Sequence, residues 1–166
     1  IDLAIAGFPH PIPGVVLEDY YLEHIVLCLS DGLLAQCGID LDTHRGEIAA
    51  GNLSALCDCP FVLGSAEDIG GRIGRGLLRS SGVSPVSKAT SENVETLLAL
   101  CEQGVGACFC PENLLHTALS PAQLTHLHIL PLCPEASYPI CFGYLSRSYP
   151  WSVLSEFIRI AREQTA

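Results

Sequence analysis

The pattern of hydrophobic and polar positions is most regular between Ser91 and Pro111, where the sequence reads SENVETLLALCEQGVGACFCP. The hydrophobic residues of its first half recur at helical spacing, at Val94, Leu97, Leu98 and Cys101. Ser91 or Asn93 can cap the first turn, because a short side-chain oxygen accepts hydrogen bonds from free backbone N–H groups. Gly104 stands where a helix commonly ends, and a short apolar run then leads to Pro111. The stretch predicts a helix, a glycine turn and a buried strand, which together form a unit of α/β sheets.

Hydrophobic alternation and short apolar runs predict further strands elsewhere in the chain. They lie at residues 2–6, 15–19, 22–30, 60–63, 127–132 and 140–145, with an extended segment at 83–90. Helical spacing predicts a single turn at 52–56 and helices at 66–81, 112–118 and 151–163, the last beginning at Trp151. Residues 33–51 show no clear period, so we expect an irregular insertion there. The order of these elements indicates an α/β protein.

The predicted helix at residues 66–81 is unusually rich in glycine, with Gly70, Gly71, Gly74 and Gly76. Ser65 is its natural N-cap, and Glu67 and Asp68 fall in the first turn, where acidic side chains suit the helix dipole. The glycines could belong to a phosphate-binding loop or could allow close helix packing. Neither a P-loop lysine nor the dinucleotide-binding pattern is present, so close packing is the favoured interpretation.

Composition and charge narrow the possible functions of the chain. With 166 residues, 49% of them hydrophobic and 16% charged, it can bury a core in one domain or two small lobes. A formal net charge of -10 repels phosphate backbones, so we expect no direct binding of nucleic acid. No apolar run reaches the ~20 residues of a membrane helix, so we expect no membrane association. The chain lacks Met and opens in a strand-like run, which suggests a piece of a longer protein.

The chain contains nine cysteines, an odd and high number. Two spacings, Cys57-x-Cys59 and Cys108-x-Cys110, could place two thiols on one face of a strand and bind a metal ion. Structural zinc sites usually space their cysteines more widely, so buried reduced thiols are the favoured interpretation. His126-x-His128 could likewise bind a metal ion, but an ordinary strand with one solvent-exposed face explains this spacing better. We therefore predict no metal site.

The elements, in this order, resemble the effector-binding domain of LysR-type transcriptional regulators. The residues that carry the resemblance are, in chain order, DLAIA, LEHIVLCLS, PFVLG, ENVETLLALCEQGVGACFCPENLL, LHILPL and ICFGYLSRSYPWSVLSEFIRIARE. In that family the corresponding segments read "DLAI", "PFI" and "TLLALVAAGLGIALLPE", with a closing "R-x-x-SP" and an amphipathic helix. The match spans almost the whole chain and is most specific between Thr96 and Pro111.

This resemblance implies a two-lobed α/β fold like that of type 2 periplasmic solute-binding proteins, with crossing hinge strands and a ligand cleft. Residues 1–29 and 140–166 would form part of lobe I, residues 30–125 lobe II, and residues 126–139 the return crossover. The chain departs from the family pattern in lacking the N-terminal winged helix-turn-helix and the first strands and helices of lobe I. The first lobe is therefore expected to be incomplete.

Three loops are expected to meet at the ligand cleft. One is Gly64-Ser65, where a hydroxyl and the free N–H groups of the following helix could bind an anion, or where Ser65 is only a helix cap. Another is Gln103-Gly104-Val105-Gly106, which could let a ligand approach the backbone or could be a helix C-terminal turn. The last is Gly7-Phe8, where the aromatic ring could stack on a ligand or only pack at the hinge. Strand ends in α/β proteins commonly hold ligands in this way.

The predicted function is that of a cytoplasmic sensor domain in a bacterial transcription regulator, which binds a small anionic metabolite. DNA would be bound only by the winged helix-turn-helix of the full-length protein, which we expect to be a homo-oligomer. No cofactor and no catalytic residue is predicted, since no serine or cysteine lies in a strained nucleophile elbow. The alternatives are a transport solute-binding protein of the same fold, which an upstream signal peptide would favour, and an enzyme on a similar frame.

Overall fold

The computed structural model describes residues 2–146 and 152–164, apart from the side chain of His116. The chain divides into two compact units, which are described separately below. Unit 1 contains Ile1–Glu23 and Tyr138–Ala166, and unit 2 contains His24–Ser137. Trp151, at the start of the last predicted helix, lies outside the described residues. Among the residues that are described, no helix is long and apolar enough to cross a membrane.

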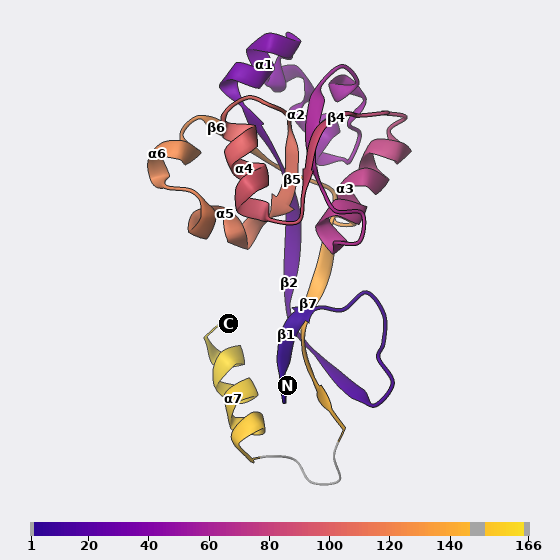
Figure 1. The fold of residues 1–166 in the computed structure, drawn as a ribbon, viewed down its shortest axis with the longest axis vertical. Coiled ribbons are helices and arrows are strands. Elements are labelled where there is room, and N and C mark those ends of the chain that lie inside the picture. Colours follow the sequence, from indigo (N-terminus) through magenta and orange to yellow (C-terminus); the bar gives the residue numbers. More distant parts are fainter. Residues whose placement is uncertain (1, 147–151, 165–166) are drawn as a thin grey trace. The chain divides into compact units, whose positions relative to one another are not determined.

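The strands of unit 2 run in mixed directions (Figure 1). The long strand β2 (Val15–Ser30) pairs antiparallel with both β5 (Cys108–Pro111) and β6 (Leu127–Pro131). Strand β3 (Pro60–Gly64) pairs parallel with β4 (Val86–Ser91). A parallel bridge between Phe61 and Ala107 places β3 beside the start of β5. As a result, β3, β4 and β5 all run in one direction.

Two helices replace the irregular segment that the sequence predicts at residues 33–51. They are α1 (Asp31–Cys37) and α2 (Leu41–Ala49), so that prediction is wrong. Ser30 caps α1 by accepting the Leu33 N–H at 3.4 Å, and Gly38 ends it with a φ of 66°. Their buried residues are Leu33, Leu34, Leu41 and Ile48. These helices are too short and too weakly amphipathic to show a clear period, and tertiary packing stabilises them instead.

The remaining helices of unit 2 follow the strands. They are the short 3-10 turn η1 (Ser54–Leu56), α3 (Ile69–Ser80), α4 (Val94–Glu102), α5 (Glu112–Ala118) and α6 (Pro121–Leu124). The sequence predicts all of these except α6, a single turn fixed by a capping box between Ser120 and Gln123. The predicted helix at 66–81 starts later than expected, because Asp68 rather than Ser65 is its N-cap. The close-packing interpretation of its glycines is supported at Gly74, where an added Cβ would lie 2.4 Å from the Phe109 ring.

One hydrophobic cluster of unit 2 lies between β2, β5 and α4. It includes the thiols of Cys28, Cys101, Cys108 and Cys110. The Sγ atoms of Cys28 and Cys110 are 3.6 Å apart, and Cys101 donates to the Cys28 carbonyl oxygen at 3.2 Å. All nine cysteines are free thiols. Cysteine thus takes the place of small hydrophobic residues in this core.

Unit 1 is built on β1 (Ala4–Gly7), β7 (Ser137–Leu145), the first part of β2 and α7 (Ser152–Glu163). β1 pairs antiparallel with β7, and Ile5 lies opposite Phe142. The buried Phe142 ring contacts the ring of Tyr20, at 4.5 Å between centroids, and that of Phe157 on α7, at 6.5 Å. β2 is one continuous strand, so the prediction of two strands at 15–19 and 22–30 is wrong: Tyr20 and Tyr21 continue the ladder.

Candidate functional site

The carboxyl ends of three strands lie together on unit 2. Gly64, the last residue of β3, pairs with Ser91, the last residue of β4. β5 runs in the same direction beside β3, so Pro111 marks its end on the same side. We call this region, with the residues that directly follow these strands, the carboxyl edge. Ligands of α/β proteins commonly bind at such an edge, because loops and helix starts converge there.

The segment after β3 brings Ser65 and the start of α3 close together. Half-buried Ser65 accepts the Glu67 N–H at 3.3 Å, and a Cβ added to Gly71 would lie only 2.0 Å from the Ser65 carbonyl oxygen. Asp68 accepts the Gly71 N–H at 2.9 Å. The carboxylate of Asp68 therefore occupies the start of α3, where the sequence predicts N–H groups free for an anion. One of those N–H groups, that of Gly71, is thus satisfied within the helix, and anion binding at this helix start stays a prediction.

A second polar turn follows β4. Ser91 accepts the Asn93 N–H at 3.0 Å, and Asn93 caps α4 by accepting the Thr96 N–H at 2.9 Å. Half-buried Ser91 thus lies at the same edge as Ser65. Sequence reasoning treated Ser91 only as a possible helix cap. Its position at the end of a strand parallel to β3 was the signal that could have identified it.

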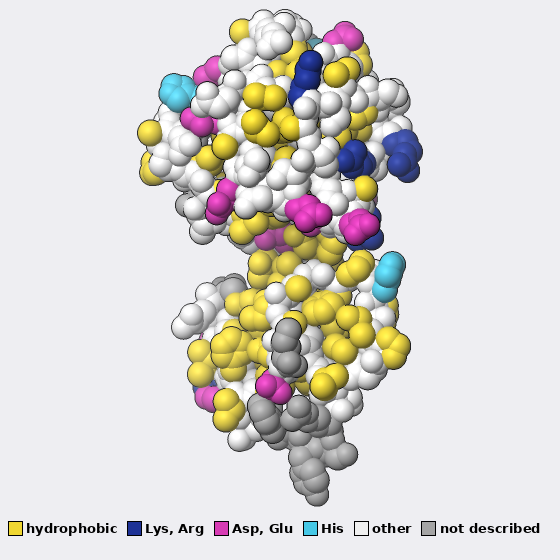
Figure 2. All heavy atoms as spheres, in the orientation of Figure 1, with side chains coloured by type: hydrophobic (Ala, Val, Ile, Leu, Met, Phe, Trp, Pro, Cys, Tyr) yellow, Lys and Arg dark blue, Asp and Glu magenta, His cyan; other side chains and the backbone are white. Residues whose placement is uncertain are grey.

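The carboxyl edge carries more acidic than basic groups. Each of the three strands is followed at once or within a few residues by exposed carboxylates, at Glu67, Asp68, Glu92 and Glu112. Arg75, nearly two turns into α3, reaches back and donates from Nη2 to the Gly64 carbonyl oxygen at 2.9 Å. Figure 2 shows acidic side chains along the border of unit 2 below α3 and α4. The edge therefore offers hydroxyl groups and carboxylates with one guanidinium beside them.

The predicted loop Gln103-Gly104-Val105-Gly106 lies at the other end of the strands. A Cβ on Gly106 would lie 2.8 Å from the Phe61 carbonyl carbon and 2.9 Å from the Pro60 oxygen, at the start of β3. Gly104 has a φ of 75°, and Val105 donates to the Leu100 carbonyl oxygen, as in a helix C-terminal turn. About 13 Å of strand separates this end from Gly64. The structure therefore does not bring this loop together with Gly64 and Ser65.

Gly7 and Phe8 belong to unit 1. Gly7 ends β1 and lies opposite Ile140 of β7. Phe8 covers Gly143, where an added Cβ would lie 2.5 Å from the Phe8 ring. The half-buried ring packs on the sheet of its own unit, as the packing alternative expects.

The candidate metal spacings do not gather ligands in the structure. Over residues 2–146 and 152–164, no group of three or more His, Cys, Asp or Glu side chains could hold a metal ion. His128 Nε2 lies 2.7 Å from Asp31 Oδ1, and His126 Nδ1 lies 3.8 Å from Asp31 Oδ2. Burial, together with the neighbouring thiol of Cys37, raises the pKa of the Cys59 thiol to about 12. A thiol held protonated in this way is a poor metal ligand and a poor nucleophile.

Comparisons with known proteins agree with this architecture. Residues 1–166 match the family described as LysR substrate binding domain. Among solved structures, a Pseudomonas aeruginosa protein assigned to the LysR family of transcriptional regulators (PA01) is similar, with 18% identity over 99% of this chain and 53% of that one, at a TM-score of 0.73. No curated protein matches.

Two solved domains have ligands in their names. The regulatory domain of Synechocystis PCC6803 CcmR, in complex with 2-PG, has 14% identity over 99% of this chain and 73% of its own, at a TM-score of 0.73. The effector-binding domain of QuiR, in complex with shikimate, has 14% identity over 98% of this chain and 71% of its own, at a TM-score of 0.69. At these identities the likeness shows the fold. The chain spans about half the length of the PA01 protein and of CbnR, at 53% and 52%.

Proposed function

Since the chain belongs to the LysR substrate binding domain family, we propose that it is the effector-sensing domain of a LysR-type transcriptional regulator. The match over all 166 residues is the observation that carries this proposal. The ligand complexes of the QuiR and CcmR domains support it, because domains of the same fold bind small molecules there. DNA binding through a winged helix-turn-helix, homo-oligomer formation and a cytoplasmic location are proposed for the full-length regulator. We propose no catalytic step, since the similar structures are named as regulators.

We place effector binding on unit 2 at the carboxyl edge. The hydroxyl groups of Ser65 and Ser91 and the backbone beside Gly64 are the polar groups offered there. Gly7 and Phe8 remain a proposal for further ligand contacts from unit 1. The sequence-based lobe assignment, with residues 1–29 and 140–166, 30–125, and 126–139 as crossover, is kept as a proposal as well. An effector would switch the regulator only by binding one arrangement of the full-length protein better than another.

The charge of the effector is the finer part of the proposal. The sequence predicts an anionic metabolite, and Arg75 beside Gly64 supports that choice. The carboxylates of Glu67, Glu92 and Glu112 oppose it, because like charges at a binding surface disfavour association. A small polar metabolite bound through hydroxyl and backbone hydrogen bonds fits the edge best, with a single negative group placed near Arg75.

A thermal-shift screen tests this function. The purified chain is heated with small hydroxy acids, shikimate among them, and with their uncharged amides, and a ligand of the folded state raises the Tm. For any compound that binds, Ser65→Ala and Ser91→Ala should each weaken affinity about five-fold, the loss of roughly one hydrogen bond. Ser87→Ala is the matched control, an exposed serine of β4 opposite Phe61, away from the edge. Equal affinity in all three variants would contradict the proposed site, and tighter binding of the amides would contradict an anionic effector.

A further inference from the structure

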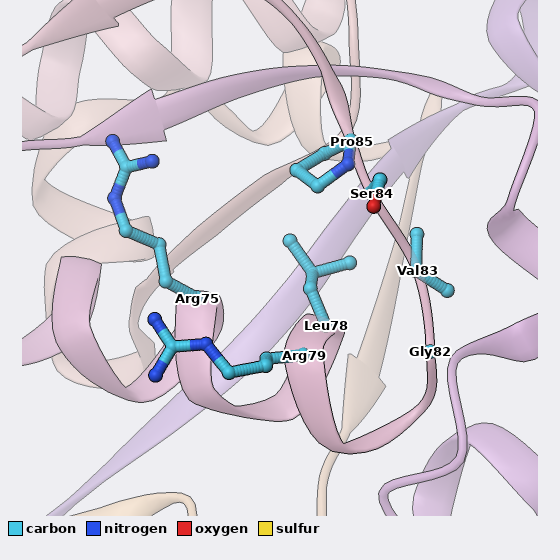
Figure 3. A pocket seen from close by; sticks show the side chains of 7 residues that line it. All are labelled: Arg75, Leu78, Arg79, Gly82, Val83, Ser84 and Pro85. Carbon is cyan, nitrogen blue, oxygen red and sulfur yellow. The ribbon is translucent and has the colours of Figure 1, made fainter.

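A pocket of about 410 Å³ lies between α3 and the loop that follows it, apart from the serines of the carboxyl edge. Leu78, Val83 and Pro85 form its apolar wall, and Ser84 adds a hydroxyl. The side chains of Arg75 and Arg79 extend along the opposite side (Figure 3). The pocket therefore combines an apolar surface with two guanidinium groups that project from one helix face.

The positive charge at this pocket contrasts with the rest of the protein. The chain has 8 Lys and Arg against 18 Asp and Glu, and three of the arginines, Arg72, Arg75 and Arg79, lie on α3. On the face shown in Figure 2, basic side chains gather over the part of unit 2 that contains α3 and β4. In α7, Arg159 forms ion pairs with Glu156 and Glu163. Neither Arg75 nor Arg79 forms an ion pair with any residue that the structure describes.

The Arg75 guanidinium is held in place while most of its donors stay unused. Its Nη2 donates to the Gly64 carbonyl oxygen at 2.9 Å. Its buried Nε finds no acceptor among the described residues. A guanidinium carries five N–H donors in a fixed plane, and a buried donor without an acceptor is costly. An acceptor from outside the protein would therefore meet an arginine that is already oriented.

We propose that this pocket binds a small organic carboxylate with an apolar body. The carboxylate would accept hydrogen bonds from Arg75 and Arg79, since arginine pairs with planar carboxylates through two parallel N–H groups. The apolar body would lie against Leu78, Val83 and Pro85. A wholly polar anion such as phosphate has no apolar part that could contact these residues. This pocket shares Arg75 with the carboxyl edge, but Ser65 and Ser91 do not line it.

Titration calorimetry of the purified chain with phenylacetate tests the proposal, with phenylacetamide as the uncharged analogue and inorganic phosphate as the purely polar anion. Phenylacetate should bind, and both comparison compounds should bind about ten-fold more weakly or not at all. Phenylacetamide loses the charge-assisted hydrogen bonds, and phosphate lacks the apolar body that contacts Leu78, Val83 and Pro85. Arg79→Ala removes an exposed side chain and should weaken phenylacetate binding about five-fold. Ser84→Glu places a negative charge in the exposed loop and should abolish binding.

Arg72→Ala is the matched control, because Arg72 is an exposed arginine of the same helix that does not line the pocket. It should leave the affinity unchanged within about two-fold, since it removes charge but no contact. Equal losses in Arg72→Ala and Arg79→Ala would mean that only the general charge of α3 attracts the acid, and would overturn the site. No heat with phenylacetate, or binding that survives Ser84→Glu in a folded variant, would overturn it as well. Ser65→Ala should leave phenylacetate binding unchanged, which separates this pocket from the carboxyl edge.

Discussion

The two ends of β3 illustrate different uses of glycine and of small polar residues. At its start, Gly106 lies against the backbone of Pro60 and Phe61, and the neighbouring Cys59 is fully buried. At its end, Gly64 and Ser65 are half-buried, and Ser91 of β4 lies beside them. The first end is closed by packing, whereas the second keeps hydroxyl groups within reach of solvent. Glycine in a turn therefore indicates a tight backbone contact as readily as a ligand site.

The closed end should be the more sensitive to substitution. Gly106→Ala forces a Cβ to 2.8 Å from the Phe61 backbone, so we expect a loss of about 3 kcal/mol in the free energy of unfolding. Urea denaturation measures it. The control is Gly76→Ala in α3, where the added Cβ meets no atom within 4 Å apart from its chain neighbours and the helix's own backbone, and where the helix should gain about 0.5 kcal/mol. Similar stabilities for the two variants would show that the start of β3 is not closed by packing.

At the open end, stability depends on the helix cap rather than on the serines. Asp68→Ala removes the acceptor of the Gly71 N–H and should cost about 1 kcal/mol in unfolding free energy. Asp68→Asn keeps an acceptor oxygen and should cost less than half as much, about 0.3 kcal/mol. The same denaturation experiment compares them, and equal losses would point to the charge rather than the hydrogen bond.

The buried thiol at the closed end predicts a dependence on pH. Burial raises the pKa of Cys59 from an ordinary value near 9 to about 12 in the folded state, so above pH 9 the unfolded chain releases this proton first. The protonated Cys59 thiol therefore contributes its full share to the free energy of unfolding below pH 9, and this share is lost as the pH rises toward 12. Cys59→Ala should therefore show a smaller loss of stability between pH 8 and pH 10.5 than the parent chain. Denaturation at each pH measures the free energy of unfolding, and parallel curves for the variant and the parent chain would contradict the raised pKa of Cys59.

The smallest effects on stability are expected at the two serines of the carboxyl edge. Ser65→Ala and Ser91→Ala remove only local hydrogen bonds to half-buried turns, so each should change the unfolding free energy by about 0.5 kcal/mol or less. Thermal unfolding of each variant checks this. A loss as large as that of Gly106→Ala would mean that these hydroxyl groups are structural, which would weaken their assignment to effector binding.

Much of this fold could be predicted from the sequence. The α4–β5 stretch was predicted because strong helical spacing, an Asn93 cap and a glycine turn all favour the same structure. The family comparison confirms the α/β fold class that the order of elements predicts. α1 and α2 were missed, because short helices are stabilised by the contacts of Leu33 and Ile48 rather than by their own periodicity.

The candidate site was predicted less completely, for a reason of topology. Gly64 and Ser65 were placed at a strand end, where the structure has them. Gln103–Gly106 was expected beside them, but a loop that leads from a helix into a parallel strand lies at the start of that strand. Ser91 was missed because the sequence does not show that β4 runs parallel to β3 and therefore ends on the same side. Strand direction, which hydrophobic pattern alone does not determine, separates the two ends.

The central claim is that an effector binds at the carboxyl edge of unit 2 and not at the Gly106 end. The most direct measurement is backbone amide chemical-shift mapping of the isotope-labelled chain with a compound that raises its Tm. We predict shifts concentrated at residues 64–71 and 91–93, with residues 103–106 unchanged. Shifts concentrated at residues 103–106, with none at Ser65 or Ser91, would contradict the claim.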